Sequence, residues 1–164
     1  MSGIDIDILL VGAGEATATT VCALRRTGLA NGVHIVPSRQ EALEVLFGAL
    51  GSERRRRPRL ILLEMTSADE DGNRFATTIA NDPRTRPVPL VVLTPSRTER
   101  HRIERNCLPA NSYVVKPADF EQLVEVVRTL AVYWLFVHEP APDADVRLAS
   151  GDRHDRRDPN SPAL

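Results

Sequence analysis

Short apolar runs, each followed by a helix-like pattern, set the organisation of the chain. Runs such as LILLE, PLVVLT and SYVVK lack polar alternation, which is typical of strands that are covered on both faces of a sheet. The expected strands cover residues 6–11, 33–36, 60–64, 89–93 and 112–115. The expected helices cover residues 15–28, 38–49, 73–81, 97–107 and 118–136. Because helices connect successive strands, the pattern predicts an α/β fold with helices on both faces of one five-stranded parallel sheet.

The chain divides by composition into one domain and a tail. Its 164 residues suit a single domain of common size with a short extension. We assign residues 1–137 to that domain. The segment 138–164 is rich in Pro, Asp, Arg, Ser and Gly and has almost nothing to bury, so we predict a disordered C-terminal tail.

The charge balance limits the classes of partner. The 21 Lys and Arg residues nearly cancel the 22 Asp and Glu residues, so no global field favours nucleic acid or a membrane surface. The basic run Arg54–Arg57 has no interleaved aromatic residues and is expected to be a solvated loop. No apolar run reaches the roughly 20 residues that span a bilayer, and no signal sequence opens the chain. We therefore expect a cytoplasmic protein with neither a nucleic-acid nor a membrane partner.

Cysteines and histidines give no metal-binding pattern. Cys22 and Cys107 lie far apart and are expected to be buried thiols of a reducing compartment, not a disulfide. The histidines are scattered and form no pair at helical spacing. No metal site is predicted.

The stretch DILLVGAGEAT joins an apolar strand to a glycine turn and a helix. Backbone amides at a turn such as Gly12–Gly14 can bind a phosphate group at a helix N-terminus. A dinucleotide fold needs a small residue where Thr17 stands, and an acidic residue after the second strand, where Arg39 could instead accept a 2′-phosphate. Binding of a small ligand or nucleotide at this turn, or an NADP-dependent enzyme, therefore remains an alternative.

Three downstream segments carry a more specific resemblance. LILLEMTSADEDG, PLVVLTPS and ANSYVVKPADFEQLVEVV resemble the third, fourth and fifth strand ends of response-regulator receiver domains. The phrases NDPRTRPVP and YVVKPADFEQL are typical of small single-domain receivers that partner bacterial phytochrome kinases. The resemblance covers about residues 6–137. It implies a doubly wound, flavodoxin-like (βα)5 architecture and a role in two-component signal transduction, not enzymatic activity.

The resemblance also places a phosphorylation site. Receivers carry an acidic pair after the first strand, a phosphoacceptor Asp after the third, a Thr or Ser after the fourth and a Lys after the fifth. Thr94 and Lys116 match, whereas the acidic pair falls on Gly12 and Ala13, and the acceptor position holds Glu64. Mg²⁺ needs oxygen ligands, and phosphoryl transfer depends on that metal and on in-line positioning. We therefore predict a degenerate receiver without metal or cofactor, acting by protein–protein contact independently of phosphorylation.

Further roles follow from the same resemblance. Lys116 should form a permanent ion pair with Glu64, which either imitates the active state in part or is a simple structural salt bridge. Tyr113 is implied to form a coupled switch with Thr94, although a strand Tyr is also an ordinary packing residue. The resemblance further implies a cis bond between Lys116 and Pro117.

The last expected helix supplies a candidate contact surface. Its apolar residues recur at three- and four-residue steps and should form one buried stripe: Phe120, Leu123, Val127, Leu130 and Trp134. Residues 131–137 are apolar without a break, which leaves Val132, Tyr133 and Phe136 in surplus. Exposed apolar patches mark interaction sites, unless the tail covers this one. The resemblance implies a homodimer through the fourth helix, fifth strand and fifth helix, and a phytochrome-type sensor histidine kinase or a downstream signalling protein as further partner.

Overall fold

The computed structural model describes residues 7–29, 32–48, 57–66, 70–105 and 108–137. Of the sequence predictions, the disordered tail at 138–164, the residues Arg54 to Arg56, and Cys107 lie outside the described residues. The domain boundary at residue 137 therefore stays a prediction.

Five strands form one parallel sheet. They are β1 (Ile8–Val11), β2 (Val33–Val36), β3 (Leu60–Glu64), β4 (Leu90–Thr94) and β5 (Ser112–Val115), in the order β2-β1-β3-β4-β5. In the register, Leu10 lies opposite both Ile35 and Leu62. The predicted fold class is confirmed. The strand order reverses at β1, and in doubly wound sheets ligand sites form at the carboxyl ends of the strands at such a point.

The helices alternate with the strands. They are α1 (Glu15–Thr27), α2 (Arg39–Phe47), α3 (Glu70–Asn81), α4 (Arg97–Arg105) and α5 (Phe120–Ala131), followed by the π-helix η2 (Val132–Val137). The side chain of Ser38 accepts a hydrogen bond from the backbone of Glu41, and Asp119 does the same for Gln122, so both residues act as N-caps. These caps start α2 and α5 one or two residues later than the apolar pattern predicts.

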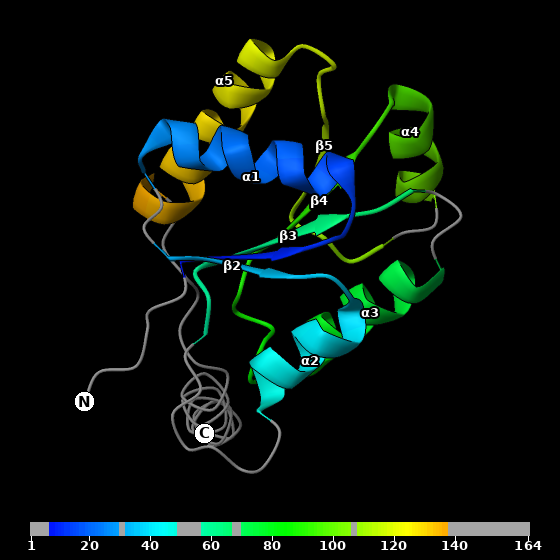
Figure 1. Ribbon diagram of the computed structural model, residues 1–164. Coiled ribbons are helices and arrows are strands. Elements are labelled where there is room, and N and C mark those ends of the chain that lie inside the picture. The colour runs from blue at the N-terminus through cyan, green and yellow to red at the C-terminus, as the bar shows by residue number, and fades with distance from the viewer. Residues whose placement is uncertain (1–6, 30–31, 49–56, 67–69, 106–107, 138–164) are drawn as a thin grey trace, which may run out of the picture.

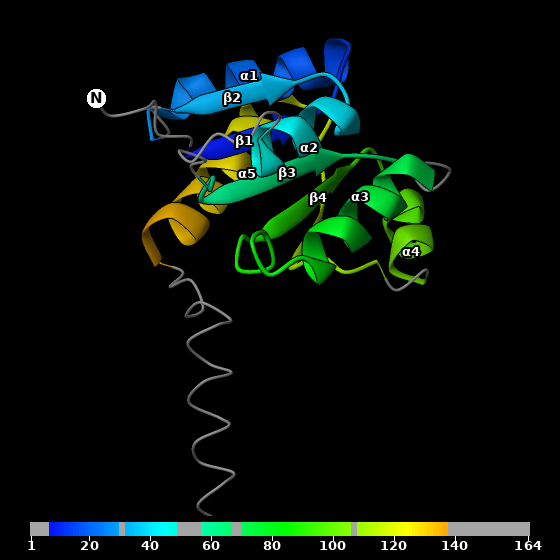
Figure 2. The same cartoon turned by 90° about the horizontal axis from the view of Figure 1, so that it is seen from below.

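Two helical layers enclose the sheet. Figure 1 shows α1 and α5 on one side and α2 and α3 on the other, and Figure 2 shows α4 beside α3. Successive strand residues face opposite layers: Ile8 and Leu10 pack with the core beneath α1 and α5, whereas Leu9 and Val11 pack with the core beneath α2, α3 and α4. Burial on both faces explains why the strands read as unbroken apolar runs.

The stripe predicted for α5 is buried in part. Leu123 and Val127 are buried as expected, but Phe120, Leu130 and Trp134 are only partly buried. The remaining fully buried positions of this segment are Val124, Ala131 and Leu135. The π-helix explains part of the difference, because its wider turn changes the residue spacing after Ala131.

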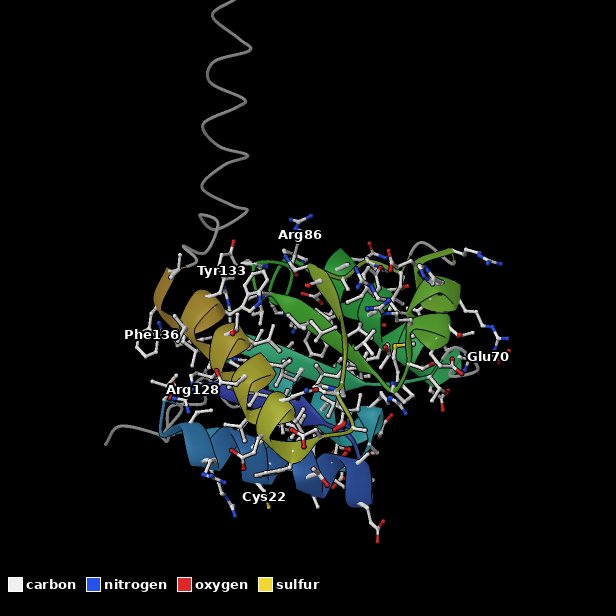
Figure 3. All side chains as sticks on the ribbon, turned by 90° about the horizontal axis from the view of Figure 1, so that it is seen from above. Cys22, Glu70, Arg86, Arg128, Tyr133 and Phe136 are labelled. Carbon is white, nitrogen blue, oxygen red and sulfur yellow. The ribbon has the colours of Figure 1, made fainter. Side chains whose placement is uncertain are left out.

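Two local predictions were wrong. Cys22 is exposed, because it lies on the outer face of α1 between the buried Val21 and Ala23 (Figure 3). The bond between Lys116 and Pro117 is trans, as are the other peptide bonds in the described segments, in line with the general preference of X-Pro bonds. None of the described helices combines the length and apolar character needed to cross a bilayer.

Candidate functional site

A crevice opens at the carboxyl ends of β1, β3 and β4. It has a volume of about 350 Å³. The ends of β1 and β3, the start of α2, and the residue after β5 line it, and its polar or glycine positions include Gly12, Thr17, Arg39, Glu64 and Lys116. The structure thus brings the predicted positions of the first, third and fifth strand ends together at the place where the strand order reverses.

Glu64 and Lys116 form an ion pair within this crevice. Glu64 ends β3 on the same face as Leu60 and Leu62, so its side chain extends toward α1. Its Oε2 atom accepts from the Lys116 ammonium, and its Oε1 atom accepts from the Thr20 hydroxyl at 3.1 Å. The side chains of Lys116 and Glu64 are only 12% and 10% exposed. The pair is therefore largely removed from water.

Backbone and helix groups complete the surroundings of Lys116. Its Nζ atom lies 3.3 Å from the Thr20 hydroxyl and 3.3 Å from the carbonyl oxygen of Ala16. The Thr20 hydroxyl is also 3.0 Å from that carbonyl. The ammonium of Lys116 thus has three oxygen acceptors, one on β3 and two on α1, and these contacts link the end of β5 to both elements.

Gly12 leaves no room for a side chain. Its N–H donates to the carbonyl of Val36 at 3.0 Å, which holds the backbone against β2. A Cβ atom at this position would lie 2.5 Å from Thr17 Oγ1 and 3.2 Å from the Cβ of Glu64. Real Cβ atoms essentially never show the first contact, and the second is tight, so glycine is required here as long as the Thr17 hydroxyl keeps its position. The neighbouring Ala13 is exposed.

The donor set does not fit Mg²⁺. This ion needs oxygen ligands in near-octahedral geometry, usually including one or two carboxylates. Gly12 and Ala13 offer none, and the Glu64 carboxylate already accepts from Lys116 and Thr20. The backbone carbonyl of Glu64 accepts from Arg39 Nη2 at 3.2 Å. Within the described segments, no three side chains of His, Cys, Asp or Glu gather closely enough to hold a metal ion.

Arg39 adds a second cation to the crevice. It is the first residue of α2, and its guanidinium reaches across to the end of β3. Burial lowers the pKa of Arg39 from its ordinary value, and the carboxylate of Asp71 opposes this effect. An arginine starts from so high a pKa that it stays charged at neutral pH. Two cationic side chains and one carboxylate therefore face the crevice.

Thr94 and Tyr113 lie on the other face of the sheet. Thr94 ends β4 at the crevice, whereas Tyr113 is paired with Val92 in the middle of β4. Thr94 is fully buried, and its hydroxyl donates to the carbonyl of Ser96 at 3.3 Å. Tyr113 packs against the core beneath α2, α3 and α4, and its hydroxyl donates to the carbonyl of Leu108. Both hydroxyls thus engage backbone of neighbouring loops. The coupled switch stays a prediction.

The end of the chain's last helical segment presents an apolar surface. Val132, Tyr133, Phe136 and Val137 are all exposed, with Phe136 at 62%. Figure 3 shows the rings of Tyr133 and Phe136 extending outward from η2. Leu135 points the other way and is buried. We call Val132, Tyr133, Phe136 and Val137 the η2 face.

Sequence reasoning missed the contribution of α1 to the site. Thr17 and Thr20 are buried on the face of α1 that lies over the sheet. Two buried threonines three residues apart at the start of this helix are a detectable signal, because buried hydroxyls need partners. The sequence did not reveal that Glu64, with its longer side chain, would be the partner of Thr20.

Comparisons with known proteins agree with this architecture. No protein-family profile matches the chain. The probable methanogenesis regulatory protein FilR2 of Methanothrix harundinacea is 32% identical over 129 residues, which cover 78% of this chain and 83% of that protein. The response regulator Rcp1 of Synechocystis is 33% identical over 79 residues, or 48% of this chain and 54% of that protein. The crystal structure of the phosphorylated cyanobacterial phytochrome response regulator RcpA superposes with a TM-score of 0.70 at 27% identity, covering 84% and 99% of the two chains.

Proposed function

The chain belongs to the response-regulator receiver family and is similar to its phytochrome-associated members, and from this premise we propose that it is a phosphorylation-independent receiver that signals through protein–protein contact. Its relatives are signalling proteins and not enzymes. What distinguishes this chain from a phosphorylated receiver is the chemistry at the ends of β1 and β3.

The Glu64–Lys116 pair is the observation that carries the proposal. In this chain the ammonium of Lys116 already donates to the carboxylate of Glu64. The Thr20 hydroxyl on α1 donates to the same carboxylate and lies close to the ammonium. Gly12 and Ala13 supply no acid for a metal, and Gly12 cannot be enlarged without moving Thr17 or Glu64. Both oxygens of the Glu64 carboxylate therefore have hydrogen-bond donors, and Lys116 has its anion, without a phosphoryl group.

The fixed pair imitates a phosphorylated site only in part. A carboxylate carries one negative charge and two oxygens, whereas a phosphoryl group carries about 1.5 to 2 charges and three acceptor oxygens. The Thr94 hydroxyl donates to Ser96 in the loop after β4. The pair holds β3, β5 and α1 in one arrangement, and the chain presents a constant surface to its partners.

The η2 face is the contact surface that we assign to this function. Its four exposed apolar side chains lie on one six-residue segment, next to the buried end of α5. Exposed apolar patches on single domains mark interaction sites, and a patch that is self-complementary across a two-fold axis gives a homodimer. We propose a symmetric dimer through this end of α5. A phytochrome-type sensor kinase or a downstream signalling protein is the second partner class.

Thermal unfolding in the presence of ligands tests the proposal against the ligand-binding alternative. A ligand that binds only the folded state at 100 times its dissociation constant stabilises it by about 2.7 kcal/mol, which raises the unfolding temperature measurably. We expect neither Mg²⁺ with beryllofluoride, a phosphoryl mimic, nor NADP to shift that temperature. Protection by Mg²⁺ with beryllofluoride would contradict phosphorylation independence.

The crevice itself gives the alternative its one supporting observation. Arg39, Lys116 and the start of the glycine turn at Gly12 and Ala13 line a volume of about 350 Å³, which suits a small anion or nucleotide. Protection by NADP that is abolished by Arg39→Gln would establish this alternative. Gln40→Ala is the matched control, because Gln40 is exposed on the next position of α2.

A further inference from the structure

A second cavity lies at the opposite edge of the sheet, where the strands begin. Its volume is about 230 Å³. Arg57, Pro58 and Arg59 precede β3 and line one side, Pro87 and Pro89 precede β4 and line the other, and Trp134 of η2 closes it. Figure 1 shows η2, in orange, at this edge, far from the crevice. We call this cavity the tryptophan groove.

The tryptophan groove has a fixed frame and a cationic rim. Arg59 donates from Nη2 to the carbonyl of Leu135, which ties η2 to the start of β3, and its Nη1 atom lies 3.9 Å from a carboxylate oxygen of Asp7. Arg57 is exposed beside it. Three prolines, Val88 and one indole supply the apolar surface. No acidic side chain is among the described residues that line it.

The sequence directly after η2 has the complementary composition. Residues 139–145 read EPAPDAD, with acidic residues at Glu139, Asp143 and Asp145 and no basic residue among them. Prolines at 140 and 142 favour the extended polyproline conformation, which docks well on aromatic and proline surfaces. Only Leu135, Phe136, Val137 and His138 separate Trp134 from Glu139. An extended chain covers about 3.3 Å per residue, so a turn back to the groove is within reach.

We propose that the acidic segment 139–145 docks on the tryptophan groove of its own chain. Its carboxylates pair with the guanidinium groups of Arg57 and Arg59, since charged hydrogen bonds of this kind are the stronger ones. Its prolines pack against Trp134. Docking of so short a segment needs no core of its own, so it agrees with the low hydrophobicity of the tail. The inference does not rest on the proposed function, because it needs neither the Glu64–Lys116 pair nor a dimer. It does share η2 with the proposed dimer, since the rings of Trp134 and Tyr133 are in contact.

Trp134 makes the proposal measurable, because it is the only tryptophan in the chain. Quenching of its fluorescence by acrylamide reports directly on access to the groove. The full-length variant Glu139→Gln, Asp143→Asn, Asp145→Asn should be quenched more strongly than the wild type. Exposed ion pairs are individually weak, and removing three should lower the docking equilibrium constant by on the order of tenfold. Raising the salt concentration should increase quenching of the wild type in the same direction.

A matched control separates docking from a general charge effect. The variant Asp152→Asn, Asp155→Asn, Asp158→Asn removes the same number of carboxylates from the distal part of the tail and should leave quenching unchanged. From the groove side, Arg57→Gln should reproduce the effect of neutralising the acidic segment. Circular dichroism verifies that each variant is folded.

Three outcomes overturn the proposal. If acrylamide quenches the acidic-segment variant no more than the wild type, the segment does not cover Trp134. An equal increase in the distal control shows a nonspecific charge effect. Protection that grows with protein concentration in the wild type but not in the acidic-segment variant shows that the segment comes from a second copy, which contradicts docking on its own chain.

Discussion

The hydroxyl of Thr20 on α1 donates to the carboxylate of Glu64 at the end of β3, over a distance of 3.1 Å. The additional methylene of Glu64, compared with aspartate, is what lets this carboxylate extend toward α1. The Cβ and Cγ atoms of Glu64 then occupy the space next to Gly12. Gly12 and Glu64 are therefore packing neighbours, and a side chain added at position 12 would have to displace Thr17 and crowd Glu64.

Breaking the buried ion pair should be costly. Lys116→Met leaves the Glu64 carboxylate buried without its cation, and such losses typically destabilise by about 3–5 kcal/mol. Urea denaturation of Lys116→Met should show a loss near the lower end of that range. The control is Glu104→Gln, which breaks the much more exposed pair with Arg100 and should cost under about 1 kcal/mol. Equal losses in the two variants would contradict a stabilising role for the pair.

Thr20→Val tests the contact from α1. The substitution keeps the shape of the side chain but removes the donor to Glu64, and an unsatisfied buried acceptor costs about 1–3 kcal/mol. Thr19→Val is the matched control, because the exposed Thr19 hydroxyl donates only to the carbonyl of Glu15 within its own helix. We expect chemical denaturation to resolve a loss for Thr20→Val alone. If Thr19→Val lowers the free energy of unfolding by as much, the loss comes from the lower helix propensity of valine and not from the contact with Glu64.

Gly12→Ala should destabilise the fold through overpacking. Its Cβ would meet Thr17 Oγ1 and the Cβ of Glu64, and inserting a methyl group into a packed site typically costs about 1–3 kcal/mol. Adding Thr17→Ala should recover part of the loss, since it removes the shorter of the two contacts. Ala13→Ser at the neighbouring exposed position should be close to neutral. Thermal unfolding of Gly12→Ala, Thr17→Ala, the double variant and Ala13→Ser checks this. A double variant whose loss is the sum of the two single losses would mean that Thr17 is not the obstacle.

Phe136→Asp should give a folded monomer. The substitution places a charge in the most exposed part of the η2 face, where it opposes burial against a second copy. Ile35→Asp is the control, because Ile35 is also an exposed large apolar residue but lies on the edge strand β2. Light scattering measures the mass, and circular dichroism measures the fold. A wild type that is monomeric at high micromolar concentration would rule out the dimer, and unfolding of Phe136→Asp would place Phe136 in the core.

The pattern of apolar positions alone predicted the sheet and its helices. Strands such as Leu60–Glu64 are buried on both faces, so they appear in the sequence as apolar runs without alternation. Element ends were less predictable. The cap at Asp119 and the widening of the helix after Ala131 depend on local hydrogen bonds that apolar spacing does not encode. The exposed thiol of Cys22 likewise depends on which face of α1 packs on the sheet, whereas the trans bond at Pro117 follows the general preference of X-Pro bonds.

The candidate site was predictable in its positions and less so in its contacts. Matching strand ends located Gly12, Glu64 and Lys116, and parallel strands bring their carboxyl ends to one edge. The contacts of Thr17 and Thr20 arise because α1 crosses directly over that edge. The helix that follows β1 supplies these groups to Glu64, which is distant in sequence, and only the spacing of the buried threonines is a sign of it in the sequence.

Phosphoryl transfer to the intact protein tests the central claim most directly. The full chain is incubated with Mg²⁺ and acetyl phosphate, and its intact mass is measured by mass spectrometry beside a receiver that carries both the acidic pair and the acceptor aspartate. We expect the mass of this chain to stay unchanged while the control gains a phosphoryl group, because Lys116 and Thr20 hold Glu64 and no acidic pair is present to bind the metal. A labile phosphoryl adduct on Glu64 would contradict the account.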